Sequence, residues 1–153
     1  IPLKILLPHL ELTLVDSVAK KVEFCQYAVD ELAFKDVYVV RGRVEKIAWD
    51  ADFRERYDLA VSRAVAHLST LSEYLLPLVR VGGRMLAMKG DRGPQEAQQA
   101  ENAIRILGGE LEQIQKVTLP GVVEDRYLIV VHKKAATPDK YPRRVGVPAK
   151  RPL

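Results

Sequence analysis

Apolar residues recur at helical spacing in four stretches of the chain. The clearest stretch covers residues 18–32, where apolar residues follow one another at steps of four and three. Ser17 precedes this stretch as a plausible N-cap. A glycine pair at 82–83 is expected to end the next one, and Pro94 opens the last. The pattern predicts the end of a helix over residues 1–8 and helices over residues 18–32, 68–78 and 94–107.

Short apolar runs between these helices predict strands over residues 10–15, 37–40, 57–62, 84–88, 111–119 and 127–131. Strands and helices alternate through most of the chain. This order predicts an α/β fold with a mostly parallel sheet, helices on both faces and an antiparallel edge pair. After Lys134 the periodicity stops, and four prolines follow. We therefore expect one domain over residues 1–134 and an extended, basic, Pro-rich tail over residues 135–153.

Polar residues stand where four of the predicted strands stop. They are Asp16, Glu45, Arg63 and Lys89. Open α/β sheets bind their ligands in the crevice beyond the carboxyl ends of their strands. If these strands are parallel, the four residues line one edge of one sheet and form a candidate active-site rim.

Composition narrows the class of protein. A chain of 153 residues with 29% charged residues is one ordinary globular domain by length. No apolar stretch approaches the roughly 20 residues that span a bilayer, so we expect no membrane segment. The single Cys25 excludes an internal disulfide framework and favours a reducing, cytoplasmic setting. The three histidines are scattered, which argues against a serine-hydrolase triad or a metal site.

Charge is distributed unevenly along the chain. Residues 132–153 contain seven lysines and arginines against one acid, Asp139, whereas residues 1–131 contain 17 basic and 19 acidic residues. A basic appendage on a slightly acidic body indicates a polyanionic partner. The tail is either a disordered end or a segment lying along a surface or an RNA backbone.

Each rim residue allows a functional and a structural interpretation. The Asp16 carboxylate can accept hydrogen bonds from a ribose diol, or it can simply favour the dipole of the following helix. Glu45 can meet the edge of a purine ring, or it is a solvated loop acid. Arg63 can hold a carboxylate or stack on a base, or it forms a structural ion pair. Lys89 can face a phosphate or a base, or it is an ordinary surface lysine.

Several segments together resemble the bacterial 16S ribosomal RNA guanine-N7 methyltransferase family, also called glucose-inhibited division protein B. They are Leu14-Val15-Asp16-Ser17 with Lys21, Val22 and Phe24; Gly42-Arg43-Val44-Glu45; Ser62-Arg63-Ala64-Val65-Ala66; Lys89-Gly90; and the tail from Tyr141-Pro142-Arg143-Arg144 through Gly146, Pro148 and Lys150 to Pro152-Leu153. The resemblance covers essentially the whole chain. Its most specific parts are the Ser-Arg-Ala segment and the tail.

The resemblance implies the Rossmann-like fold of class I S-adenosylmethionine-dependent methyltransferases. It further implies that Asp16 lies at the cofactor ribose, that Ser17 also belongs to the cofactor site, that Val44 and Glu45 meet the adenine, and that Arg63 contacts the cofactor or helps to position the target guanine. Arg63 and Lys89 would then serve the methyl transfer. The implied reaction methylates N7 of a guanine in the 530 loop of the decoding region. The implied partners are 16S rRNA and the small ribosomal subunit.

Two departures from the family pattern matter for the cofactor. Many methyltransferases of this class have an Asp after the glycine that ends the third strand, where this chain has Arg43. The glycine-rich cofactor loop and first strand of the family are expected immediately before Ile1 and are missing from this sequence. We therefore expect these 153 residues alone to bind S-adenosylmethionine poorly.

Two other functions stay open at this stage. One is a non-catalytic RNA-binding or ribosome-associated module, in which the basic tail is the functional part. The other is a different nucleotide-using α/β enzyme, such as a dehydrogenase, whose dinucleotide fingerprint would lie in the first βα turn.

Overall fold

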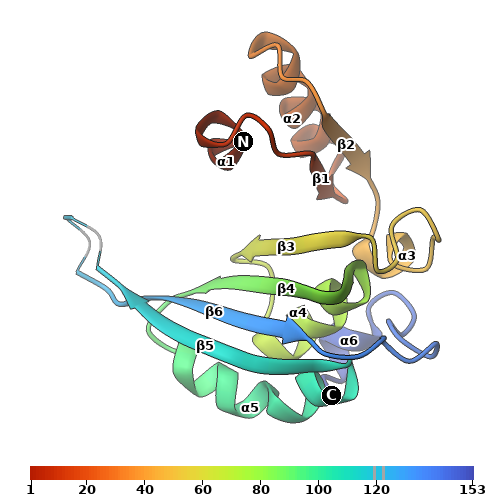
Figure 1. Cartoon of the computed structure of the whole chain (residues 1–153), viewed down its shortest axis with the longest axis vertical. Helices are drawn as coiled ribbons and strands as arrows, with labels where there is room; N and C mark the ends of the chain where they lie inside the picture. Colours follow the sequence, from red (N-terminus) through yellow and green to blue (C-terminus); the bar gives the residue numbers. More distant parts are fainter. Residues whose placement is uncertain (119, 122) are drawn as a thin grey trace. The chain divides into compact units, whose positions relative to one another are not determined.

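A computed structural model describes residues 1–118, 120–121 and 123–153 (Figure 1). The chain forms two compact units, residues 1–44 and residues 45–153. No helix among the described residues has both the length and the apolar character needed to cross a membrane.

The first unit contains two parallel strands and two helices. In chain order it consists of α1 (Pro2–Leu6), β1 (Leu12–Asp16), α2 (Ala19–Glu31) and β2 (Val37–Arg41). The register pairs Asp16 with Arg41, so the carboxyl ends of β1 and β2 lie next to each other. Helix α2 connects the two strands, and its Val29 is buried. This βαβ order confirms the predicted alternation in this part of the chain.

The second unit contains a four-stranded sheet in the order β3-β4-β6-β5. Helix α3 begins at Val44, on the boundary between the units. The elements are α3 (Val44–Ile47), β3 (Tyr57–Arg63), α4 (Leu68–Leu75), the 3₁₀ helix η1 (Leu76–Leu78), β4 (Val79–Lys89), α5 (Gly93–Ile106), β5 (Gly109–Val117), β6 (Arg126–Lys133) and α6 (Val147–Lys150). The strand predicted over residues 111–119 corresponds to β5, and residue 119 lies outside the described residues.

The hydrogen bonding of the strands refines two expectations. The predicted single sheet is divided, because β1-β2 and β3-β4-β6-β5 are separate sheets among the described residues. The predicted antiparallel edge pair is formed by β6 and β5, with β6 inside, next to β4, and β5 at the edge. The physical reason is polarity: β6 is rich in apolar residues, with Ile129 and Val131 fully buried, whereas β5 is mostly polar and exposed. A polar strand is better suited to an edge.

The core of the second unit lies between the sheet and two helices. Helices α4 and α5 pack against each other, and α5 runs along β5 and β6 (Figure 1). The fully or almost fully buried side chains of this core include Leu68, Leu71, Met85, Ile104, Ile129 and Val131. Tyr141, from the predicted tail, belongs to the same cluster.

Residues 135–153, which we call the strap, therefore belong to the folded second unit. The side chain of Trp49 donates a hydrogen bond to Pro142 O (2.9 Å), and Thr70 donates to Pro148 O (3.1 Å). Of the two states expected for the tail, a disordered end and a segment lying along a surface, the structure has the second.

Two local predictions were wrong. Ser17 does not cap α2: the helix begins one residue later, with Val18 at the N-cap, and the side chain of Asp16 takes the Val18 N–H instead. The glycine pair at 82–83 does not end a helix. Pro77 lies in the 3₁₀ turn that ends α4, and both glycines lie inside β4. A Cβ on Gly83 would stand 2.7 Å from Asp58 O, so the backbones approach too closely there for a side chain.

Candidate functional site

Asp16 ends β1 with its carboxylate fixed by local contacts. Its Oδ1 accepts the Val18 N–H at 2.8 Å, and Lys21 Nζ lies 3.5 Å from Oδ2. The hydrogen bond from Val18, helped by the charge of Lys21, lowers the pKa of Asp16 below its usual 3.8. About a third of the side chain is exposed. The group is therefore an ionised acceptor with lone pairs left for a ligand, which fits a ribose diol.

The other predicted cofactor residues of the first unit lie near this strand end. Ser17 follows Asp16 directly and is exposed. The Gly42 N–H donates to Asp16 O at 3.0 Å, which ties the turn after β2 to the end of β1. Val44 follows two residues later and starts α3. The first unit thus brings together Asp16, Ser17 and the segment that leads into Val44.

Glu45 belongs to the second unit and is engaged by the strap. It is 4% exposed, and its Oε1 accepts the Gly146 N–H at 3.0 Å. Glu45 is thus not a solvated loop acid. One of its oxygens holds the strap in place.

Arg63 ends β3 with an exposed side chain. Among the described residues, its guanidinium has no ion pair and no side-chain hydrogen bond, so the structural ion pair considered above is not formed there. The following residue, Ala64, has a φ of +56°. Left-handed backbone at a non-glycine residue costs about 1–3 kcal/mol and persists only where surrounding contacts hold it.

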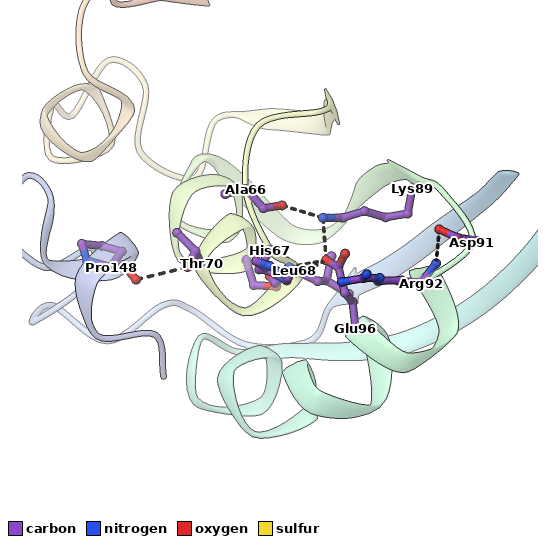
Figure 2. A network of polar contacts seen from close by, with 10 residues as sticks. Ala66, His67, Leu68, Thr70, Lys89, Asp91, Arg92, Glu96 and Pro148 are labelled. Atoms are coloured by element: carbon purple, nitrogen blue, oxygen red, sulfur yellow. Dashed lines mark hydrogen bonds and ion pairs between the residues drawn. The ribbon is translucent and has the colours of Figure 1, made fainter. Parts of the chain in front are cut away.

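Lys89 and Glu96 supply such contacts for the segment after β3 (Figure 2). Lys89 Nζ donates to Ala66 O at 2.5 Å and lies 2.7 Å from Glu96 Oε2. The same Glu96 oxygen accepts the Leu68 N–H at 2.9 Å, and His67 Nδ1 lies 3.7 Å from it. The side chains of Lys89 and Glu96 are only 11% and 15% exposed. Lys89 is thus not an ordinary surface lysine.

Ser62 adds a buried hydroxyl beside Arg63. It is 9% exposed, and its Oγ has no hydrogen-bond partner among the described residues. Buried polar atoms are normally hydrogen-bonded, so an unpaired one at a strand end marks a position where a ligand atom or a water can bind.

Sequence reasoning found Arg63 and Lys89 but missed Ala64 and Glu96 next to them and, elsewhere in the second unit, Trp49. Glu96 gave no signal because it lies on α5, outside any strand end. The left-handed Ala64 gave none because alanine rarely adopts that conformation. Trp49, the only tryptophan, was not considered because it lies in a loop between predicted elements. The described residues contain no cluster of three or more His, Cys, Asp or Glu side chains that could hold a metal ion.

The profile of the family described as "GidB: rRNA small subunit methyltransferase G" matches residues 1–127. The ribosomal RNA small subunit methyltransferase G of Lactobacillus delbrueckii subsp. bulgaricus is 46% identical over 153 residues, which are 100% of this chain and 64% of that protein. This chain therefore spans slightly less than two thirds of the length of these curated relatives.

Two solved structures show the fold. An rRNA methylase from Streptococcus thermophilus has a TM-score of 0.58 at 16% identity, covering 80% of this chain and 73% of that one. Geranyl diphosphate methyltransferase in complex with SAM has a TM-score of 0.56 at 14% identity, covering 79% and 68%. The fold is that of the Rossmann-like, class I S-adenosylmethionine-dependent methyltransferases, with a mixed sheet, as the sequence predicted. With the family profile matched over most of its length, this chain belongs to the GidB family, rRNA small subunit methyltransferase G.

Proposed function

We propose that this chain belongs to an enzyme that transfers a methyl group from S-adenosylmethionine to N7 of a guanine in 16S rRNA, in the 530 loop. The observation that carries the proposal furthest is Arg63: a guanidinium without a partner among the described residues, at the end of β3 and beside a strained, braced segment. The partners are 16S rRNA and the small ribosomal subunit, and the setting is the bacterial cytoplasm.

Asp16 is the residue that fits the cofactor best. Its carboxylate is ionised at neutral pH and partly exposed, so it can accept hydrogen bonds from the two ribose hydroxyls. Ser17, which follows Asp16, and Val44, two residues after the Gly42 that donates to Asp16 O, would complete the contact with the nucleoside. When bound, the cofactor supplies a methyl group on a positively charged sulfur.

Arg63 positions the acceptor base or contacts the cofactor. Guanine N7 carries a lone pair in its neutral form, so the reaction needs no general base. What the chain must supply is orientation of N7 and electrostatic support for the charge that moves onto the base. A guanidinium can stack on the base or donate to the O6 atom next to N7.

Lys89 acts through the segment that carries Arg63. Because its ammonium already donates to Ala66 O and faces Glu96, we assign it a positioning role rather than direct contact with the reacting atoms. Glu45 places a carboxylate next to the segment leading from β2, where the family resemblance expects the adenine, and it also holds Gly146 of the strap.

The experiment uses this chain joined to the part of the L. delbrueckii relative that the alignment leaves uncovered. We expect this fusion to transfer labelled methyl groups to small-subunit RNA from cells that lack N7 methylation. Arg63→Lys in the same fusion keeps the charge and loses the planar fork, and it should reduce transfer at least tenfold.

The alternative, a non-catalytic RNA-binding module, is favoured by one observation, the basic strap. It predicts that the fusion binds RNA but transfers no methyl group, and that Arg63→Lys changes nothing. Methyl transfer that depends on Arg63 excludes this alternative, and binding without transfer excludes the enzyme.

A further inference from the structure

Trp49 and the strap line an open hollow that no part of the proposed reaction uses. Its volume is about 460 Å³ and its lining residues are Trp49, Lys140, Pro142, Arg143, Arg144 and Val147, all within the second unit. The lining combines a large aromatic ring, two aliphatic side chains and three cations, without an acid.

The indole of Trp49 is fixed in place and still half exposed. Its Nε1–H donates to Pro142 O at 2.9 Å, and the Arg54 guanidinium lies 5.5 Å from the ring centroid. Arg54 is itself held, because it donates to Tyr141 O and Thr137 O, both at 2.9 Å. The side chain of Trp49 nevertheless stays 49% exposed. A tryptophan ring held in this way offers an exposed aromatic surface, and Trp is enriched among the residues that dominate binding energy at interfaces.

The three cations of the lining differ in availability. Arg143 is committed to Glu73, with Nη2 2.6 Å from Oε2. Lys140 and Arg144 are exposed, and neither has an ion pair with an acid among the described residues. Lys140 lies over the Tyr141 ring at 5.3 Å. The hollow therefore offers two uncompensated positive charges beside a rigid aromatic surface.

We propose that this hollow binds one unstacked nucleotide of single-stranded RNA, with the base against Trp49 and flanking phosphates on Lys140 and Arg144. The assignment to RNA rests on the proposed function, and the chemistry follows from the lining. Single-stranded RNA is recognised by stacking of bases on aromatic rings and by cations that follow the backbone. An acidic peptide would satisfy the two cations and leave the aromatic surface unused.

Trp49 reports on its own site, because it is the only tryptophan of the chain. The experiment titrates the 153-residue chain with an unstructured twelve-nucleotide RNA and follows tryptophan fluorescence. The same titration uses an abasic ribose-phosphate strand of equal length and polyglutamate of equal charge. We expect the RNA to quench Trp49, and the abasic strand and polyglutamate to leave its emission unchanged. RNA binding without quenching, or equal quenching by polyglutamate, would overturn the proposal.

A second measurement uses variants that spare the folded core. Lys140 and Arg144 are exposed, so Lys140→Ala combined with Arg144→Ala should leave the fold intact. We expect at least fivefold weaker RNA binding and a salt dependence smaller by about 1.4 in log–log slope, since each phosphate contact to a single strand contributes about 0.7. The matched control, Lys20→Ala with Lys35→Ala, removes the same charge from the first unit. Equal losses in both double variants would mean that binding follows net charge alone, and the site would be rejected.

These outcomes separate this proposal from the proposed function. Quenching of Trp49 by RNA together with a fusion that never methylates supports the nucleotide site and rejects the enzyme. Methylation that depends on Arg63, without any quenching of Trp49, supports the enzyme and rejects the nucleotide site.

Discussion

At the scale of single residues, the segment after β3 combines strain with support. Ala64 adopts a left-handed conformation, and the next carbonyl to be fixed is Ala66 O, held by Lys89. Glu96 takes the Leu68 N–H and so closes the segment at the start of α4. This bracing leaves the Arg63 side chain as the group free to bind a ligand. Because the backbone of this segment is already fixed, only the side-chain rotamers of Arg63 need to be ordered when it binds.

Replacing Arg63 by alanine should separate function from stability. The guanidinium has no partner among the described residues, so Arg63→Ala should change the free energy of unfolding by less than about 0.5 kcal/mol. Methyl transfer by the fusion should fall at least tenfold, whereas the exposed Arg105→Ala on α5 should retain it. Urea unfolding and a methyl-transfer assay measure both effects. Full activity in Arg63→Ala would contradict the role assigned to it.

Replacing Glu96 tests the bracing itself. Glu96→Ala removes the acceptor of Leu68 N–H and the partner of the largely buried Lys89, so it should cost about 1–3 kcal/mol in the free energy of unfolding. Glu96→Gln keeps an oxygen acceptor and should cost less. Urea denaturation followed by circular dichroism gives both values. If Glu96→Ala unfolds at the same urea concentration as the parent, the network does not support the segment.

Sequence reasoning placed Arg63 and Lys89 at strand ends correctly but treated them alike. Their difference comes from Glu96, which lies seven residues after Lys89 on α5 and reaches back to it. Such a contact depends on how α5 packs against the sheet, and a strand-end pattern carries no information on that packing. The buried setting of Glu45 was missed for the same reason, since its partner Gly146 is 101 residues away.

At the scale of elements, the strap is the part of the structure whose order is most dependent on distant contacts. Glu73 on α4 is fully buried and accepts the Arg143 backbone N–H at 2.7 Å as well as hydrogen bonds from Nε and Nη2 of the Arg143 guanidinium. Glu55 Oε1 accepts the Thr137 N–H at 2.7 Å. The sequence of residues 135–153 has no periodicity, and Glu55 and Glu73 lie 82 and 70 residues away from their partners in it, so its position could not be predicted.

The buried pair should matter far more than an exposed pair of similar geometry. Glu73→Ala leaves Arg143 without its carboxylate and should cost about 2–4 kcal/mol, since breaking a buried pair strands the other charge. Arg84 and Glu112 also form a bidentate pair but are 50% and 38% exposed, so solvent screens the pair and Arg84→Ala should cost much less than Glu73→Ala. Urea unfolding compares the two. Equal costs would show that the strap is not anchored by Glu73.

Lys133, the last residue of β6, makes the stability of the second unit depend on pH. The side chain is fully buried and donates to Leu76 O at 2.6 Å; burial lowers the pKa of Lys133 below its usual 10.5, against the opposing charge of Glu55. The unfolded chain therefore binds more protons than the folded one just below pH 10.5, and stability from this group rises with pH in that range. The free energy of unfolding of the parent relative to Lys133→Met should increase as the pH approaches 10.5. A flat difference would contradict the lowered pKa.

At the scale of the whole molecule, one edge of β1 and one edge of β3 have no strand partner among the described residues. Leu59 and Val61 on β3 are exposed, as are Phe24 and Tyr27 on α2. The curated relatives are longer than this chain, which covers 64% of the first of them. The alternation of strands and helices along the sequence was enough to predict the α/β class. The division into two units depends on which strands pair with one another, and the alternation carries no information on that pairing.

The difference in length between this chain and its curated relatives leads to a prediction about the affinity for S-adenosylmethionine. We expect calorimetry to detect no micromolar binding of S-adenosylmethionine to the 153 residues alone, and clear binding to the fusion with the uncovered part of the relative. Asp16→Asn in the fusion should weaken that binding about tenfold, because an amide accepts fewer hydrogen bonds than a carboxylate. Micromolar binding by the 153 residues alone would contradict this expectation.

The position of the transferred methyl group tests the central claim most directly. Small-subunit RNA treated with the fusion and S-adenosylmethionine is digested to nucleosides and analysed by mass spectrometry against standards. The account predicts N7-methylguanosine, assigned to the 530 loop of 16S rRNA by sequencing of the modified fragment, and its loss in Arg63→Ala. A methyl group on another atom or another nucleotide, or its undiminished presence in Arg63→Ala, would contradict the account.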